Sequence, residues 1–112
     1  MVKLIMSYKI ISSQRQYLTI SMLLDIFSQR QIKAEIWPRL IFLKLIKLEY
    51  LAEDGRKTDK IDTTNPDFKA NFYCDLKYFF DSPDIRHLRL NLPKSLQNII
   101  LDKLYSLLTE NN

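Results

Sequence analysis

Side chains that could perform catalysis are scarce in this chain. His87 is the only histidine and Cys74 the only cysteine, so a nucleophile–base pair of these two types would need both of them. One thiol excludes an intramolecular disulfide and a cysteine-rich zinc site. One glycine cannot build a glycine-rich phosphate loop. We therefore expect a protein that is not an enzyme, with no catalytic residue, metal site or cofactor, a solvated His87 and a buried Cys74.

Two carboxylates and a lysine nevertheless have a spacing with chemical meaning. Asp67 follows a proline, and Asp75 and Lys77 are separated by one residue. This resembles the Pro-Asp … Asp-x-Lys spacing of restriction-type nucleases, in which the acids hold Mg²⁺ and the lysine steadies the attacking water. That family carries these residues on neighbouring strands, whereas here the pattern predicts a helix. We therefore expect Asp67 to be a helix N-terminal acid.

Aromatic residues are concentrated in one segment. Six of them fall within thirteen residues beginning at Phe68, together with two lysines. Phe68, Phe72 and Phe79 have helical spacing and are predicted to be core residues. Tyr73 and Tyr78 lie off that face, and rings of this kind beside basic side chains can stack on single-stranded bases. They are the candidate base-stacking residues.

The charges are segregated along the chain. Residues 1–47 have a net charge of +6, residues 48–84 of −4 and residues 85–112 of +2, although the total is only +4. Such a pattern indicates a polyanion or an acidic protein as partner, or only charge that keeps the protein in solution. The candidate nucleic-acid-binding residues are Arg15, Arg30, Lys33, Arg39, Lys44, Lys47, Arg86 and Arg89.

Periodicity predicts a mainly α protein, a compact bundle of about four helices in a single domain, 1–112, with α+β as the alternative. The first predicted helix has Tyr17, Ile20, Leu24 and Phe27 on one face, and the second, 38–51, is apolar around most of its circumference. A turn and exposed loop follow at 52–65.

After residue 64, the secondary structure is predicted from short local motifs. Asn65-Pro66-Asp67 predicts the start of a helix that ends near Phe80, and Pro93 opens a C-terminal helix. Alternation of polar and apolar residues favours a short strand at 85–92, and another short strand is possible near the N-terminus. Because the chain has a single glycine, we expect little use of left-handed backbone.

These features favour a small basic accessory subunit that binds nucleic acid or a nucleoprotein complex. It is similar in size and character to the small helical subunits that line RNA or DNA in CRISPR effector complexes. The alternative is a protein–protein interaction module, such as an adaptor, inhibitor or homodimer, that uses the apolar helix 38–51. No stretch of about 20 apolar residues is present, so no membrane span is predicted, and we expect a cytoplasmic protein.

Overall fold

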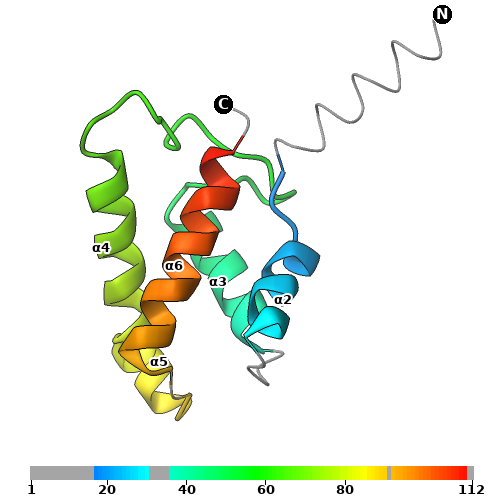
Figure 1. Cartoon of the computed structure of the whole chain (residues 1–112), viewed down its shortest axis with the longest axis vertical. Helices are drawn as coiled ribbons and strands as arrows, with labels where there is room; N and C mark the ends of the chain where they lie inside the picture. The colour runs from blue at the N-terminus through cyan, green and yellow to red at the C-terminus, as the bar shows by residue number, and fades with distance from the viewer. Residues whose placement is uncertain (1–16, 31–35, 91, 111–112) are drawn as a thin grey trace, which may run out of the picture.

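The computed structural model describes residues 17–30, 36–90 and 92–110 and confirms the mainly helical prediction. The first strand predicted near the N-terminus lies outside these residues. The helices in the described part are α2 (Ile20–Gln29), α3 (Ile36–Lys47), α4 (Phe68–Phe80), α5 (Pro83–His87) and α6 (Lys94–Thr109) (Figure 1).

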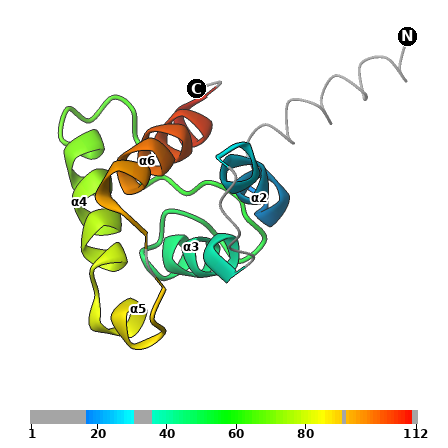
Figure 2. The ribbon, with the colours of Figure 1, turned by 60° about the horizontal axis from the view of Figure 1, so that its bottom comes forward.

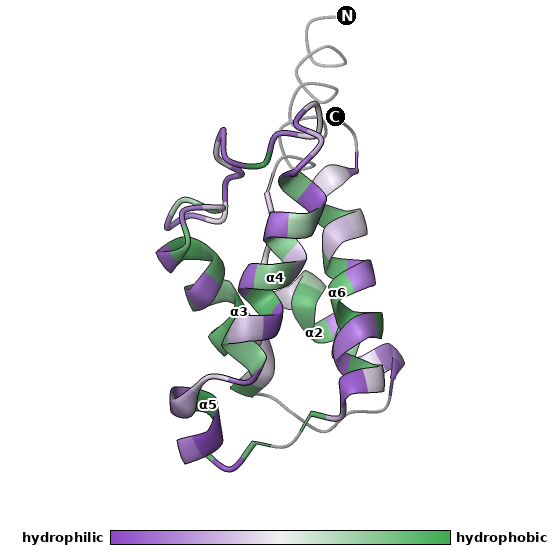
Figure 3. Ribbon diagram, turned by 90° about the vertical axis from the view of Figure 1, so that its left-hand side faces the viewer, coloured by the Kyte–Doolittle hydropathy of each residue, from purple (hydrophilic) through white to green (hydrophobic). Residues whose placement is uncertain are grey.

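Four of these helices pack around one core. α6 contacts α4 on one side and α2 on the other, and α2 contacts α3. α3 meets α4 through Trp37 and Phe80, whose ring centroids are 5.6 Å apart at 70°. The four helices thus form a closed ring, and the short α5 lies outside it below α3 and α4 (Figures 2 and 3).

The sequence predicts α4 well because its signals are local. Asn65 accepts a hydrogen bond from the backbone N–H of Asp67 through its side-chain oxygen at 2.9 Å, and the helix begins one residue later. The predicted face is buried, as confirmed at Phe72 and Leu76 in its centre. The expected C-terminal helix is also confirmed, with Pro93 at its N-cap.

The buried face of α2 differs from the predicted one. Thr19 caps the helix by accepting the N–H of Met22 at 3.2 Å. Leu23, Ile26 and Phe27 are buried, whereas Leu24, expected on the apolar face, is exposed. The ten residues of α2 include several apolar ones, so either of two faces of the helix could be the buried one. The face that is buried is the one that contacts both α3 and α6.

The strand predicted at 85–92 is wrong. Ser82, Pro83 and Asp84 supply an N-cap position, a proline in the first turn and an acid near the helix start, and α5 forms instead. The alternation then ends at Arg89, which has φ 57°. This left-handed backbone cannot continue a strand.

α3 ends in a Schellman motif without a glycine. The N–H of Tyr50 donates to the carbonyl of Leu45, and the N–H of Glu49 donates to that of Ile46, both at 2.9 Å. Glu49 occupies the left-handed position with φ 68°. Within the described residues, left-handed backbone occurs only at Glu49, Gly55 and Arg89, so its use is small, as expected, but two of the three positions are not glycine.

The turn predicted after residue 51 is confirmed, and it contains the one glycine. The N–H of Gly55 donates to Ala52, and its carbonyl accepts the N–H of Leu18 at 2.9 Å. A Cβ at Gly55 would lie 2.4 Å from the carbonyl oxygen of Leu18, and its φ is 89°. This turn therefore requires glycine, and it ties the segment before α2 to the loop after α3.

Replacing Glu49 by glycine is expected to stabilise the protein. A residue with a Cβ in the left-handed region costs about 1–2 kcal/mol, part of which glycine recovers, so Glu49→Gly should raise the free energy of unfolding by about 0.5–1 kcal/mol. Denaturant unfolding measures this change. Glu49→Ala is the control, because it removes the same carboxylate but keeps a Cβ. Equal stabilities of the two variants would contradict the argument.

Candidate binding groove

A groove of about 480 Å³ lies between α3, the end of α4 and α5. Figure 2 shows how these three helices are arranged. We call it the α3–α5 groove. Its volume lies within the range of about 300–1,000 Å³ that is typical of ligand pockets. The residues that line it are Leu40, Leu43, Lys44, Lys47, Tyr78, Phe79, Ser82, Pro83, Asp84, Ile85 and Leu88.

Apolar side chains form both the floor and the rim of the α3–α5 groove. Phe79 and Ile85 are buried beneath it, whereas Leu43, Tyr78 and Leu88 are 62%, 75% and 47% exposed. These three are the majority of the five large apolar side chains that are exposed in the described part of the chain. Their convergence on one groove distinguishes them from single exposed apolar residues, which are common on any surface.

The two walls of the groove carry opposite charges. Lys44 and Lys47 lie on α3, and Asp84 lies in the first turn of α5. The Nζ atom of Lys44 is 5.7 Å from the centroid of the Phe79 ring. The single ion pair found within the described residues joins Arg56 and Asp54. Neither lysine nor Asp84 therefore has a described partner of opposite charge.

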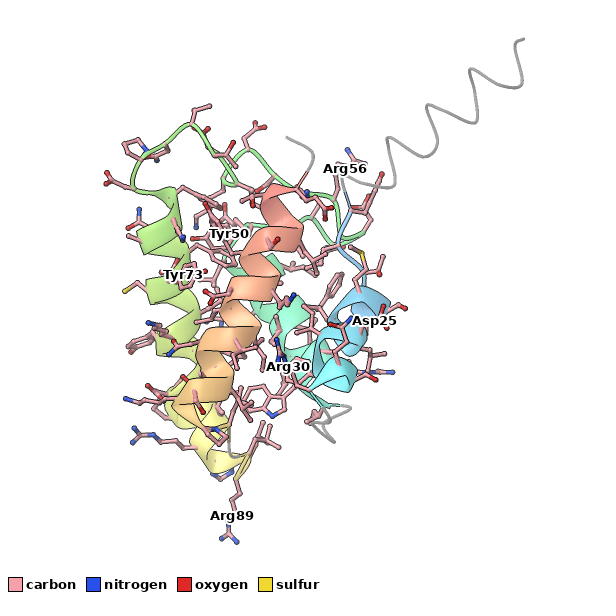
Figure 4. All side chains as sticks on the ribbon, in the orientation of Figure 1. Asp25, Arg30, Tyr50, Arg56, Tyr73 and Arg89 are labelled. Atoms are coloured by element: carbon pink, nitrogen blue, oxygen red, sulfur yellow. The ribbon has the colours of Figure 1, made fainter. Side chains whose placement is uncertain are left out.

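The structure brings three of the sequence-predicted residues together, namely Lys44, Lys47 and Tyr78. Arg39 lies on α3 one turn before Leu43 and is exposed, but does not line the groove. The remaining described candidates are Arg30 at the C-cap of α2, Arg86 on α5 and Arg89 after it. Arg89 points away from the helices (Figure 4). Arg15 and Lys33 lie outside the described residues.

Tyr73 is half-buried between α4 and α6. Its ring centroid is 5.7 Å from that of Tyr105 and 6.1 Å from that of Phe72. Its hydroxyl donates a hydrogen bond to Asp102 at 2.6 Å, which joins α4 to α6. Of the two tyrosines proposed to stack on bases, Tyr78 thus has the more accessible ring.

Sequence reasoning missed the apolar rim of the groove. Leu43 belongs to the segment 38–51, which the sequence predicts to be apolar around most of its circumference. The sequence does not show which of these apolar side chains is exposed. Leu88 lies in the predicted strand 85–92, which does not form, and is the C-cap residue of α5. The Ser82-Pro83-Asp84 helix start is a local signal for α5, but no local signal shows that α5 lies near α3.

The residues with nuclease-like spacing, Asp67, Asp75 and Lys77, all belong to α4 or its N-cap. Asp67 is the N-cap of α4, and Asp75 and Lys77 lie on that same helix. Asp75 accepts a hydrogen bond from the hydroxyl of Tyr50 at 2.7 Å. No cluster of three or more potential metal-ligating side chains occurs in the described ranges.

Cys74 and His87 are both accessible. Cys74, expected to be buried, is exposed on α4 because it lies opposite the face that contacts the core. His87, at the end of α5, is solvated as expected. None of the helices formed by the described residues is long and apolar enough to cross a membrane.

Comparisons with protein-family models, curated proteins and solved structures gave no match. The class that the fold defines is a small, mainly helical domain.

Two tyrosine hydroxyls anchor α4 to its neighbours (Figure 4). Burial raises the pKa of Tyr50, and its hydrogen bond to Asp75 raises it further. Burial and the hydrogen bond to Asp102 likewise raise the pKa of Tyr73. In both cases the folded protein favours the neutral phenol, which donates a hydrogen bond to a carboxylate.

The free energy of unfolding is therefore expected to fall at alkaline pH. Both groups have an ordinary pKa of 10.0, so their contribution is complete below pH 10 and is lost as the pH rises through the raised folded values. Each tyrosine can lower the free energy of unfolding by at most about 1.4 kcal/mol per pH unit, and Tyr73 by less, because water screens its partly exposed hydroxyl. Denaturant unfolding between pH 8 and 11 should show a shallower decline for Tyr50→Phe/Tyr73→Phe. The control, Tyr78→Phe, alters an exposed ring and should follow the wild type; an unchanged slope in the double variant would refute this assignment.

Proposed function

We propose that this chain is a non-enzymatic binding module that holds an apolar segment of a protein partner in the α3–α5 groove. The observation that carries the proposal is the convergence of Leu43, Tyr78 and Leu88 on that groove. An exposed apolar groove with charged side chains beside it, here Lys44, Lys47 and Asp84, is typical of a protein-interaction site. This corresponds to the interaction module that the apolar helix 38–51 suggests.

The energetics of the groove favour such a partner. Burying the exposed parts of Leu43, Tyr78 and Leu88 would contribute on the order of 1 kcal/mol for each side chain. Tyrosine is also among the residues that most often dominate binding energy at protein interfaces. Phe79 and Ile85 are already buried beneath the rim, so a partner side chain entering the groove would meet a packed apolar floor.

The same composition argues against nucleic acid as the occupant of the groove. Protein–DNA interfaces are more polar and more positively charged than protein–protein interfaces. The lining here includes Leu40, Leu43 and Leu88 and only two basic side chains. Tyr78 could stack on a base, but the aliphatic side chains that surround it have no such role.

A peptide-display selection on the whole immobilised chain tests the proposal. Peptides enriched on the wild type should bind it in a fluorescence anisotropy assay and bind Leu43→Asp at least about tenfold more weakly, since a carboxylate on the rim must lose its water. Leu24→Asp is the matched control, because Leu24 is an exposed leucine on α2 that does not line the groove.

Circular dichroism should give the same helical signal for both variants. Enrichment of no peptide, or of peptides that are insensitive to Leu43→Asp, would overturn the groove as the binding site.

A second candidate function is sequence-independent binding of nucleic acid, alone or within a nucleoprotein complex. The observation that favours it is the set of basic side chains that have no ion-pair partner among the described residues. This set includes all the described candidates from the sequence, namely Arg30, Arg39, Lys44, Lys47, Arg86 and Arg89. Basic residues without acidic partners are available to neutralise phosphates.

Anisotropy of labelled single- and double-stranded oligonucleotides at several salt concentrations tests this candidate. If Arg39 and Lys47 contact phosphates, Arg39→Glu/Lys47→Glu should make the slope of log K against log salt shallower by about two for double-stranded DNA. Lys94→Glu/Lys103→Glu changes the net charge equally on α6 and serves as the control. Absence of binding at low salt, or an equal loss in both variants, would contradict the candidate.

A further inference from the structure

We propose that the segment that enters the α3–α5 groove is an amphipathic helix whose carboxylates face α3. This inference rests on the proposed function, because it names the chemistry of the partner at the same groove. It follows from the type of element that the groove can accept and from the positions of the charges along its walls.

The elements around the groove select the form of the partner. An extended peptide that adds to a sheet needs an exposed strand edge, and the groove is lined by α3, α4, α5 and the turn between the last two. A polyproline segment needs a groove lined mainly by aromatic rings, and here Tyr78 and Phe79 are outnumbered by aliphatic side chains. A helix laid into an apolar groove is the mode that fits these walls.

The α3 wall repeats one chemical pattern at helical spacing. Leu40 is followed four residues later by Lys44, and Leu43 is followed four residues later by Lys47. Residues four apart on a helix lie on one face, about 6 Å apart along the axis. A second helix beside α3 has the same spacing, so an apolar residue and an acidic one placed one turn apart can meet a leucine and its lysine.

The charges on this wall are available for such pairing. The Nζ atom of Lys44 lies 5.7 Å from the centroid of the Phe79 ring. Its ammonium group has no carboxylate partner among the described residues. Lys47 is exposed and also lacks one. Across the groove, Asp84 offers the opposite charge. A helix with acids on its α3 side and a basic residue on its α5 side complements both walls, and electrostatic complementarity of this kind sets orientation and specificity.

The test repeats the display selection with three versions of the whole chain as bait. On the wild type, enriched peptides should carry Asp or Glu three or four residues from their apolar positions. On Lys44→Glu/Lys47→Glu, the enriched peptides should carry Lys or Arg there instead. Lys94→Glu/Lys103→Glu has the same net charge as the groove variant, so it shows whether the acidic preference comes only from the charge of the whole protein.

Synthetic peptides from the wild-type selection give the quantitative result. Their affinity should fall about tenfold in Lys44→Glu/Lys47→Glu and stay within about twofold in Lys94→Glu/Lys103→Glu. A proline placed in the middle of the peptide should abolish binding, because it breaks a helix.

The possible failures can be told apart. Peptides that depend on Leu43 but have no acidic pattern, or that tolerate the central proline, would overturn this inference and leave the proposed groove in place. Peptides that do not depend on Leu43 would overturn both. If oligonucleotides compete with the selected peptides and bind more tightly than they do, nucleic acid is the occupant and the inference is wrong.

Discussion

The position of α3 against α4 depends on the packing of Tyr50. This residue follows the left-handed turn at Glu49, and its ring lies 5.3 Å from that of Phe72, edge to face at 77°. Its hydroxyl reaches Asp75 on the same helix, and the Nζ atom of Lys60 lies 4.8 Å from its ring centroid. Aromatic pairs of this geometry contribute about 0.5–1.5 kcal/mol beyond their buried area.

Tyr50 acts together with a second contact at the other end of α3. Trp37 meets Phe80 at the end of α4, whereas Tyr50 meets residues near the start of α4, so the two helices run antiparallel. The contacts at both ends of α3 place Leu43 and Tyr78 on the same groove. The α3 wall of the α3–α5 groove is therefore positioned by core packing.

Local signals explain which parts of the fold the sequence predicts. The start of α4 depends on Asn65 and Pro66, and its buried face on a regular repeat, so neither needs information from distant residues. The buried face of α2 and the difference between Tyr73 and Tyr78 depend on where α6 lies. The two tyrosines are five residues apart on α4, so only one of them can lie beside α6. The groove was unpredictable for the same reason, since its two lysines come from α3 and its tyrosine from α4.

α5 is only five residues long, and its one buried side chain is that of Ile85. Helices shorter than about 12 residues are marginal on their own in water, so this wall of the groove depends on Ile85 and on the helix start at Pro83 for its existence. A partner that covers Leu88 would therefore stabilise the α5 helix as well as gain apolar contact. If the proposed partner occupies the groove, formation of α5 and its binding would be thermodynamically linked, each making the other more favourable.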